Sequence, residues 1–325
     1  MRWRDRILGA VALTPFVIGT VVGASAAGPV DGTEVCAFSD PRIVEASGLV
    51  ETGGVFVTMN DSGDSARVFA VDPHTCDTVG VTTWDAHAVD QESLAPGGRP
   101  GTVWVGDTGD NFRVRKFITV VQVPVGHGDR HVPGQVRRLV YPDGPHDAET
   151  LLRDPRTGRL FVVSKEFIGH IYAAPRHLHA GDNRLTKGRS VLGLATDGAF
   201  FPDGRHIVLR NYGQAAFYTW PGLARIATVD LPRQQQGEGI AVTADDRIFL
   251  SSEGTDAPVL QVHLSASVRV ALAGDSPHAP HPTAAAPPGA GETTSHPAWP
   301  WAAGGAVVLV ALAGLVVLVA RRTRR

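Results

Sequence analysis

Acidic residues recur in short, glycine-containing segments of this sequence, and carboxylates grouped in this way can bind a metal ion. The segments "NDSGD" (residues 60–64) and "GDTGDN" (106–111) each end an apolar run, whereas "DQESLA" (90–95), "DAETLL" (147–152) and "GEGIAV" (237–242) each begin one. Ca²⁺ takes six to eight oxygen ligands at about 2.3–2.6 Å. If the segments converge in the fold, they predict a Ca²⁺ site.

The candidate metal ligands are the carboxylates of these segments and of two related ones. They are Asp61, Asp64, Glu92, Asp107, Asp110, Glu149, Asp197, Glu238 and Glu253. Gly63 and Gly109 should let two of the loops turn tightly, so that backbone carbonyls can join the site. The alternative is that Asp/Gly/Ser loops are ordinary strand connections. The segment "DSGDSARVFAVD" is not an EF-hand loop, because its twelfth position is not glutamate.

Three basic residues near these segments are candidates for holding an anion such as phosphate beside the metal: Arg115, Lys165 and Arg210. The alternative is that they balance the acids in salt bridges. The sequence has no G-x-S-x-G motif and no H-E-x-x-H motif, so it indicates neither a serine-hydrolase elbow nor a zinc-protease site.

The acidic segments belong to a repeat. Counting from Leu49, Leu94, Leu151, Ala199 and Ile240, the openings follow one another at intervals of 41 to 57 residues. Intervals of this length indicate a repeat array. Each opening leads to a second apolar run, namely "VFVTMND", "VWVGDTG", "LFVVSKE", "HIVLRNY" and "IFLSSEG", and then to two more. Short, β-branched runs bounded by turns are typical of strands.

Five units of four strands predict an all-β fold, a five-bladed β-propeller. Six blades remain an alternative if the widest interval contains a degenerate unit, and a β-sandwich would not explain the recurring acidic opening. The segment "GTEVCAFSD" before the first unit should pair with the last blade or cover the first, and "SVRVALA" should be the last strand. We expect no helix between residues 27 and 275.

The propeller geometry explains how the acids would meet. The innermost strand of a blade lines the central axis, and the second strand runs antiparallel to it. The start of the first strand and the end of the second therefore lie at the same end of the axis. Since the acids occupy these two positions in nearly every unit, we expect them to converge.

The two ends of the chain predict its location. Residues 1–26 have a basic start, an apolar stretch and an A-x-A site, which is typical of a signal peptide, with an uncleaved anchor as the alternative. Residues 301–320 are uncharged and long enough to form a transmembrane helix, and the basic tail 321–325 should be cytoplasmic. A Pro/Ala/Thr-rich linker, 276–300, would connect this single membrane span to an extracellular domain, 27–275.

Charge and cysteine content narrow the partners and the compartment. The formal net charge of −2 gives no indication of nucleic acid as a partner. Cys36 and Cys76 are the two cysteines of the sequence. An even pair in an oxidising compartment predicts a disulfide, and two separate buried thiols are the alternative.

Several segments resemble known propellers. "SGLV", "FVTMNDSGDSARVFAVD", "DQESLA", "VWVGDTGDNFRVRKFITVVQVP" and "YPDGPHDAETLL" resemble a family of secreted actinobacterial propeller proteins of unassigned activity. "QQGEGIAVTADDRIFLSSE" is similar to a repeat of β-propeller phytases, and the whole resembles phytase-like and esterase-like propellers. The resemblance implies channel acids that hold Ca²⁺ and bases that hold phosphate, with Glu238 and Glu253 at the acidic positions. The other phytase ligand segments are not recognisable here.

Three classes of function fit these patterns, and a propeller fold does not decide among them. We favour a membrane-anchored, cell-surface module that contains Ca²⁺ and binds an extracellular ligand, whose identity the sequence does not indicate. The alternative is a Ca²⁺-dependent extracellular hydrolase of phosphoesters, lactones or other esters. The third class is a scaffold protein without a ligand.

Overall fold

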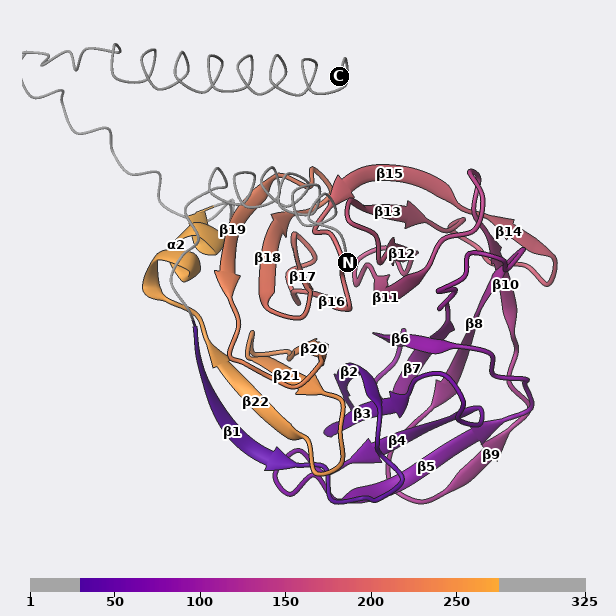
Figure 1. The fold of residues 1–325 in the computed structure, drawn as a ribbon, viewed down its shortest axis with the longest axis horizontal. Helices are drawn as coiled ribbons and strands as arrows, with labels where there is room; N and C mark the ends of the chain where they lie inside the picture. Colours follow the sequence, from indigo (N-terminus) through magenta and orange to yellow (C-terminus); the bar gives the residue numbers. More distant parts are fainter. Residues whose placement is uncertain (1–29, 275–325) are drawn as a thin grey trace, which may run out of the picture. The chain divides into compact units, whose positions relative to one another are not determined.

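A computed structural model describes residues 30–274 and arranges them as five antiparallel sheets around a central axis (Figure 1). This arrangement is a β-propeller with five blades, as the repeat predicts, and the alternative of six blades is wrong. The innermost strands are β2, β6, β11, β16 and β20 (Figure 1).

The first three blades follow one another along the chain. Blade 1 consists of β2 (Ala46–Thr52), β3 (Val55–Asn60), β4 (Arg67–Val71) and β5 (Thr78–Trp84). Blade 2 consists of β6 (Gln91–Pro96), β7 (Thr102–Asp107), β8 (Ile118–Pro124) and β10 (Arg137–Val140). Blade 3 consists of β11 (Ala148–Arg153), β12 (Leu160–Ser164), β13 (Gly169–Ala173) and β15 (Thr186–Val191).

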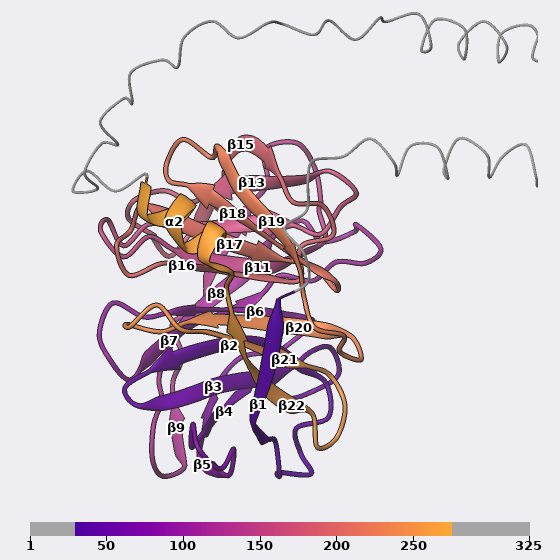
Figure 2. The same ribbon diagram turned by 90° about the vertical axis from the view of Figure 1, so that its left-hand side faces the viewer.

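The last two blades complete the ring. Blade 4 consists of β16 (Asp197–Phe200), β17 (His206–Arg210), β18 (Gln214–Thr219) and β19 (Arg225–Asp230). Blade 5 consists of β20 (Gly237–Val242), β21 (Ile248–Ser252), β22 (Pro258–His263) and, as its outermost strand, β1 (Asp31–Ala37). The register of β1 on β22 runs from Asp31 opposite His263 to Ala37 opposite Pro258, and the two strands lie side by side in Figure 2. Of the two alternatives for "GTEVCAFSD", pairing with the last blade is confirmed.

The segment "SVRVALA" is not a strand, and the expectation of no helix is wrong. It lies in α2 (Ala266–Gly274), which buries Val268. Val268, Leu264 and Leu272 join the apolar cluster between blades 4 and 5. Because β1 already occupies the outer edge of blade 5, the chain after β22 has no strand to pair with.

Two short strands add a fifth member to blades 1 and 2. They are β9 (Arg130–Val132), parallel to β5, and β14 (Asp182–Arg184), parallel to β10. Each belongs to the connection of the following blade, so each joins two neighbouring blades through backbone hydrogen bonds. Neither strand follows from the sequence patterns described above.

The hydrophobic core is divided among the five contacts between neighbouring blades, with one buried cluster at each. All residues of β3, β12, β17 and β21 are buried. A second strand is covered by a neighbouring blade on each side, which explains why these runs are almost continuously apolar rather than alternating.

The predicted disulfide is confirmed. Cys36 of β1 is bonded to Cys76 of the β4–β5 turn, with their Cα atoms 5.6 Å apart. The bond therefore joins blade 5 to blade 1 across the point where the ring closes. In the chain-entropy model, closing a loop of 40 residues stabilises a fold by about 3–4 kcal/mol.

The described residues include no helix long and apolar enough to cross a membrane. The predicted signal peptide (1–26), the linker (276–300), the transmembrane helix (301–320) and the tail (321–325) lie outside the described residues. They stay predictions.

Candidate functional site

The inner hairpins bring the predicted acids to one end of the axis, which we call the acidic face. In each blade, a residue at the start of the first strand is opposite a residue at the end of the second. The partners are Ala46 and Asn60, Gln91 and Asp107, Ala148 and Ser164, Asp197 and Arg210, and Gly237 and Ser252. In every blade, the start of the first strand therefore lies beside the end of the second, as predicted.

Irregularities in the inner strands set the aim of three glutamates. The register shifts between Gln91 and Ser93, between Ala148 and Thr150, and between Gly237 and Ile240. Glu92, Glu149 and Glu238 lie within these bulges. A bulged residue has no direct partner across the ladder, and the local bend re-aims its side chain. The inner hairpin of blade 4 has no such shift, and its acid behaves differently.

Five carboxylates, which we call the acidic ring, influence one another's ionisation. They are Asp61, Asp90, Glu92, Glu149 and Glu238. Burial, followed by the charges of Glu149 and Asp90, raises the pKa of Glu92 to about 11. Burial and the neighbouring Glu45 raise the pKa of Asp61 to about 7. Burial also raises the pKa of Glu238 to about 7, even though Lys165 lowers it.

Burial and neighbouring acids likewise raise the pKa of the other two members of the acidic ring. Burial and the charge of Glu238 raise the pKa of Glu149 well above its usual range, although Lys165 opposes the shift. Burial and the charge of Asp147 raise the pKa of Asp90. The ring therefore favours protons or another cation between its carboxylates.

Four oxygens of the acidic ring are buried without a hydrogen-bond partner among the described residues. They are Asp61 Oδ1, Asp90 Oδ1, Glu149 Oε2 and Glu238 Oε2. They come from blades 1, 2, 3 and 5. A buried polar atom that lacks a partner costs about 1–3 kcal/mol, and more when it is charged. In their present rotamers, no three Asp, Glu, His or Cys side chains of residues 30–274 are arranged to hold one ion.

Other predicted metal ligands are occupied by protein groups. Asp107 accepts hydrogen bonds from the amides of Val89 (2.8 Å) and Asp90 (3.1 Å) and pairs with Arg115 at 2.7 Å. Asp110 accepts the amides of Val114 (2.9 Å) and Arg115 (2.8 Å). These two carboxylates brace the loop between β7 and β8.

Two further predicted ligands lie at the edge of the ring. Asp64 accepts hydrogen bonds from Arg67 Nε at 2.8 Å and from Asn60 Nδ2 at 2.9 Å. Glu253 accepts a hydrogen bond from the amide side chain of Gln236, and burial raises its pKa.

Asp197, the acid of blade 4, ties three inner strands together. Its Oδ2 accepts the amides of Leu49 (3.2 Å) and Ile240 (2.8 Å), and its Oδ1 accepts that of Gly198 (2.7 Å). The side chain is fully buried, and burial raises its pKa to about 8 against the effect of these hydrogen bonds. Its oxygens are therefore directed at backbone groups of blades 1, 4 and 5.

The three predicted anion-binding bases also have acceptors within the protein. Lys165 Nζ donates to Glu149 Oε1 and lies 5.2 Å from the centre of the Tyr212 ring. Arg115 Nη1 donates to the carbonyl of Gly109 at 2.7 Å. Arg210 is fully buried, and its Nη1 donates to the carbonyls of Gly239 (3.0 Å) and Ser251 (3.3 Å), among others.

The two glycines play different roles. Gly63 has a φ of +91°, so its loop uses a turn that favours glycine, as predicted. Gly109 has no positive φ, and space explains it instead. A Cβ atom there would lie 2.3 Å from Asp90 Oδ2 and 2.8 Å from Glu92 Cγ. The backbone of this loop therefore lies directly against two members of the acidic ring.

Asp90 and Asp147 were not among the predicted ligands, although "DQE" and "DAE" place each of them two residues before a predicted glutamate. Both acids directly precede an inner strand and so lie at the acidic face. A network at the same end of the axis was also not predicted, in which His146 lies between Asp143 (3.0 Å) and Glu166 (3.2 Å). No sequence motif links these three residues.

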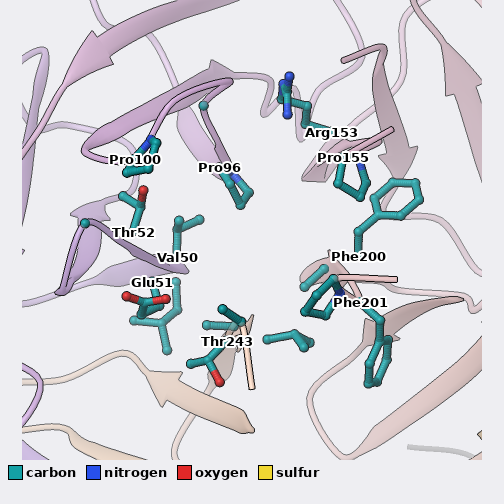
Figure 3. Close-up of a pocket in the computed structure, with 18 of the residues that line it drawn as sticks. Val50, Glu51, Thr52, Pro96, Pro100, Arg153, Pro155, Phe200, Phe201 and Thr243 are labelled. Carbon is teal, nitrogen blue, oxygen red and sulfur yellow. The ribbon is translucent and has the colours of Figure 1, made fainter. Parts of the chain in front are cut away.

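The other end of the axis, which we call the opposite face, contains a pocket of about 440 Å³ (Figure 3). Val50, Pro96, Pro155 and Phe200 are among the residues that line it. Arg153 and Glu51 lie on different sides of the pocket in Figure 3. The pocket is built from the ends of the same five inner strands whose beginnings form the acidic face.

No family model matches the chain, and a search of curated proteins found no match. The resemblance to actinobacterial and phytase-like propellers therefore stays a prediction, while the five-bladed fold rests on the structure.

Proposed function

We propose that this protein is a cell-surface, ligand-binding propeller whose acidic ring holds a divalent cation, Ca²⁺. The observation that carries the proposal is the set of four buried carboxylate oxygens without partners, which four different blades supply. A shared cation would satisfy them together, whereas protons satisfy them one at a time. Oxygen donors in this number suit Ca²⁺ better than Mg²⁺, which requires a small octahedral shell.

Binding requires the glutamate side chains to change rotamer. Glu149 would turn from Lys165 toward the axis, and Glu92 would release the hydroxyl of Ser47, which now donates to its Oε2 at 3.2 Å. The ion would displace the protons that the raised pKa values retain, so affinity should increase with pH.

The membrane anchor is part of the same proposal. The apolar stretch 301–320 and its basic tail support a single span with the propeller outside the cell. The Cys36–Cys76 disulfide supports an oxidising compartment. Protease treatment of intact cells should release the propeller. Protection of the propeller, with loss of only the last residues, would contradict this orientation.

Calorimetry and thermal unfolding of the full chain test the cation site directly. Ca²⁺ should release or absorb heat, raise the melting temperature in a saturable way, and act more strongly than Mg²⁺. By mass action, a Ca²⁺ concentration a hundred times Kd stabilises the fold by about 2.7 kcal/mol. The double variant Glu149→Gln/Glu238→Gln should lose this effect.

Glu51→Gln is the matched control, because Glu51 belongs to an inner strand but lies at the opposite face. It should retain the whole response to Ca²⁺. The proposal is wrong if millimolar Ca²⁺ gives neither heat nor a shift in the wild-type protein, or if both variants respond alike.

A further inference from the structure

Large apolar side chains are exposed almost entirely on the acidic face. Ten such residues are exposed within residues 30–274, and nine lie in loops that lead into an inner strand or out of a second strand. The nine are Val44, Val89, Phe112, Val114, Phe117, Phe167, Ile168, Leu194 and Tyr212. The tenth, Val270, is on α2. An apolar surface of this kind, gathered rather than scattered, marks an interaction site.

Six of the nine lie in loops of blades 2, 3 and 4 that contact one another, and we call these six the apolar rim. They are Phe112, Val114, Phe167, Ile168, Leu194 and Tyr212. Arg113 pairs with Glu166 at 3.3 Å, and the amide of Leu194 donates to the carbonyl of Glu166 at 2.7 Å. Lys165 lies over Tyr212. These contacts connect the four loops that contain the rim residues.

The rim side chains are exposed even though hydrogen bonds hold the backbone beneath them. Asp110 fixes the loop between β7 and β8 by accepting the amides of Val114 and Arg115. The side chain of Phe112 on this loop is nevertheless 87% exposed, and that of Phe167 is 86% exposed. A loop whose backbone is already fixed binds a partner at a smaller entropic cost than a loop that must become ordered on binding.

We propose that the apolar rim and the acidic ring together bind a polypeptide segment in which a lysine or arginine lies between apolar residues. The basic group would enter the acidic ring and donate to its unpartnered carboxylate oxygens, while the flanking apolar residues would cover Phe112 and Phe167. The rim extends over three blades, which suits a chain segment rather than a small cation.

Charge complementarity selects this partner. The acidic ring presents carboxylates, whereas Arg113, Arg115 and Lys165 are paired with Glu166, Asp107 and Glu149. These bases are therefore occupied. An anionic partner would add negative charge beside carboxylates that already disfavour one another's ionisation, whereas a cationic group would favour their ionised form. Such complementarity steers association and excludes wrongly charged partners. The inference stands without the metal, because Ca²⁺ and the basic side chain would be alternative occupants of the ring.

The test uses the full chain in phosphatidylcholine nanodiscs and two fluorescein-labelled peptides. One has the sequence Ser-Phe-Leu-Lys-Leu-Phe-Ser, and the other has glutamate in place of lysine. Fluorescence anisotropy in EDTA should show that the lysine peptide binds at least about tenfold more tightly, a factor typical of one buried charge pair. Empty nanodiscs measure the background.

Variants separate the two parts of the surface. Phe112→Ser/Phe167→Ser should weaken binding of the lysine peptide at least about tenfold, as expected when aromatic contact residues are removed. Glu149→Gln/Glu238→Gln should bring the affinity for the lysine peptide toward that for the glutamate peptide. Val270→Ser, which removes an exposed apolar side chain on α2, away from the rim, should change nothing.

Three results would overturn the inference. The first is equal affinity for the two peptides, and the second is unchanged binding by Phe112→Ser/Phe167→Ser. The third is binding of phosphatidylglycerol vesicles without binding of the lysine peptide, a lipid surface that the exposed Lys116 beside the rim would favour. Added Ca²⁺ should weaken binding of the lysine peptide by competition. Peptide binding that persists in a protein showing no response to Ca²⁺ would refute the proposed metal site alone.

Discussion

The two faces of this propeller are built from the same ten strands and differ in almost every chemical property. On the acidic face, three glutamates lie within bulges of the inner strands, and the loops expose large apolar side chains. On the opposite face, blade 1 turns back through Gly53 and Gly54, whose φ values of 62° and 82° suit a two-residue hairpin, and short loops connect the inner and second strands of the other blades. Function on this scaffold is therefore decided by strand ends and loops, not by the blades themselves.

The two faces also differ in how their polar groups are satisfied. The pocket of the opposite face is lined largely by proline, alanine, valine and phenylalanine, so it buries few groups that need partners. The acidic face buries carboxylates whose oxygens lack partners. A face that leaves such groups unsatisfied sacrifices stability, which is common at binding sites. The predictions below test this difference in order of expected effect.

The largest effect is expected for Asp197, the acid of blade 4 that accepts backbone amides from blades 1 and 5. Asp197→Ala would leave the buried amides of Leu49, Gly198 and Ile240 without their acceptor. We expect a loss of about 3 kcal/mol in the free energy of unfolding. Asp197→Asn keeps one acceptor oxygen and should cost about 1 kcal/mol. Urea denaturation distinguishes the two, and equal effects would contradict the assigned contacts.

The next effect is a dependence of stability on pH. Asp61, Glu92 and Glu238 have folded-state pKa values of about 7, 11 and 7, all above those of ordinary carboxyls. The folded state therefore binds more protons than the unfolded state, and their contribution is fully present below about pH 4. It is lost as pH rises through the raised values, so stability in EDTA should fall between about pH 5 and pH 8.

Melting temperatures measured across this range test the prediction. Glu92→Gln should reduce the slope, because glutamine resembles the protonated acid. Saturating Ca²⁺ should reduce it as well, since the ion replaces the protons. Stability that rises steadily with pH in EDTA would show that the ring carboxylates are stabilised as anions, against the prediction.

The smallest effect is expected on the opposite face. Arg153 makes no hydrogen bond or ion pair with another described residue, and burial lowers its pKa. Arg153→Met keeps most of the apolar stem and should change the free energy of unfolding by less than about 0.5 kcal/mol. The Ca²⁺ response should be unchanged. A large loss of stability, or a large loss of the response to Ca²⁺, would mean that the two faces are coupled through the inner strands.

The acidic face could be predicted because it depends on local patterns. Strand periodicity and antiparallel hairpins were enough to place Glu92, Glu149 and Glu238 beside Asp61. Which carboxylates keep a free oxygen could not be predicted, because this depends on amides from distant strands. Asp197 and Glu149 have equivalent positions in their blades, yet only Asp197 accepts hydrogen bonds from backbone amides of blades 1 and 5.

Other differences between prediction and structure have the same origin. The strands β9 and β14 pair in parallel with a neighbouring blade, so no local alternation marks them. The segment "SVRVALA" has a strand-like composition and forms α2 because β1 already fills the edge of blade 5. The exposure of Phe112 and Phe167 could not be predicted either, because the sequence does not indicate whether an apolar residue in a loop faces the core or the solvent.

Closure of the ring by β1 means that the last blade can be completed only after nearly the whole propeller has been synthesised. The strand β1 is near the beginning of the propeller sequence, and its partner β22 is near the end. Asp31 is opposite His263, so almost the whole propeller lies between them in the sequence. Chain termination before β22 would leave β1 with an unpaired edge, and such edges promote aggregation. Cys76, only 40 residues after Cys36, can hold β1 near blade 1 long before β22 exists. Oxidation of this cysteine pair during synthesis would therefore position β1 before its partner strand exists.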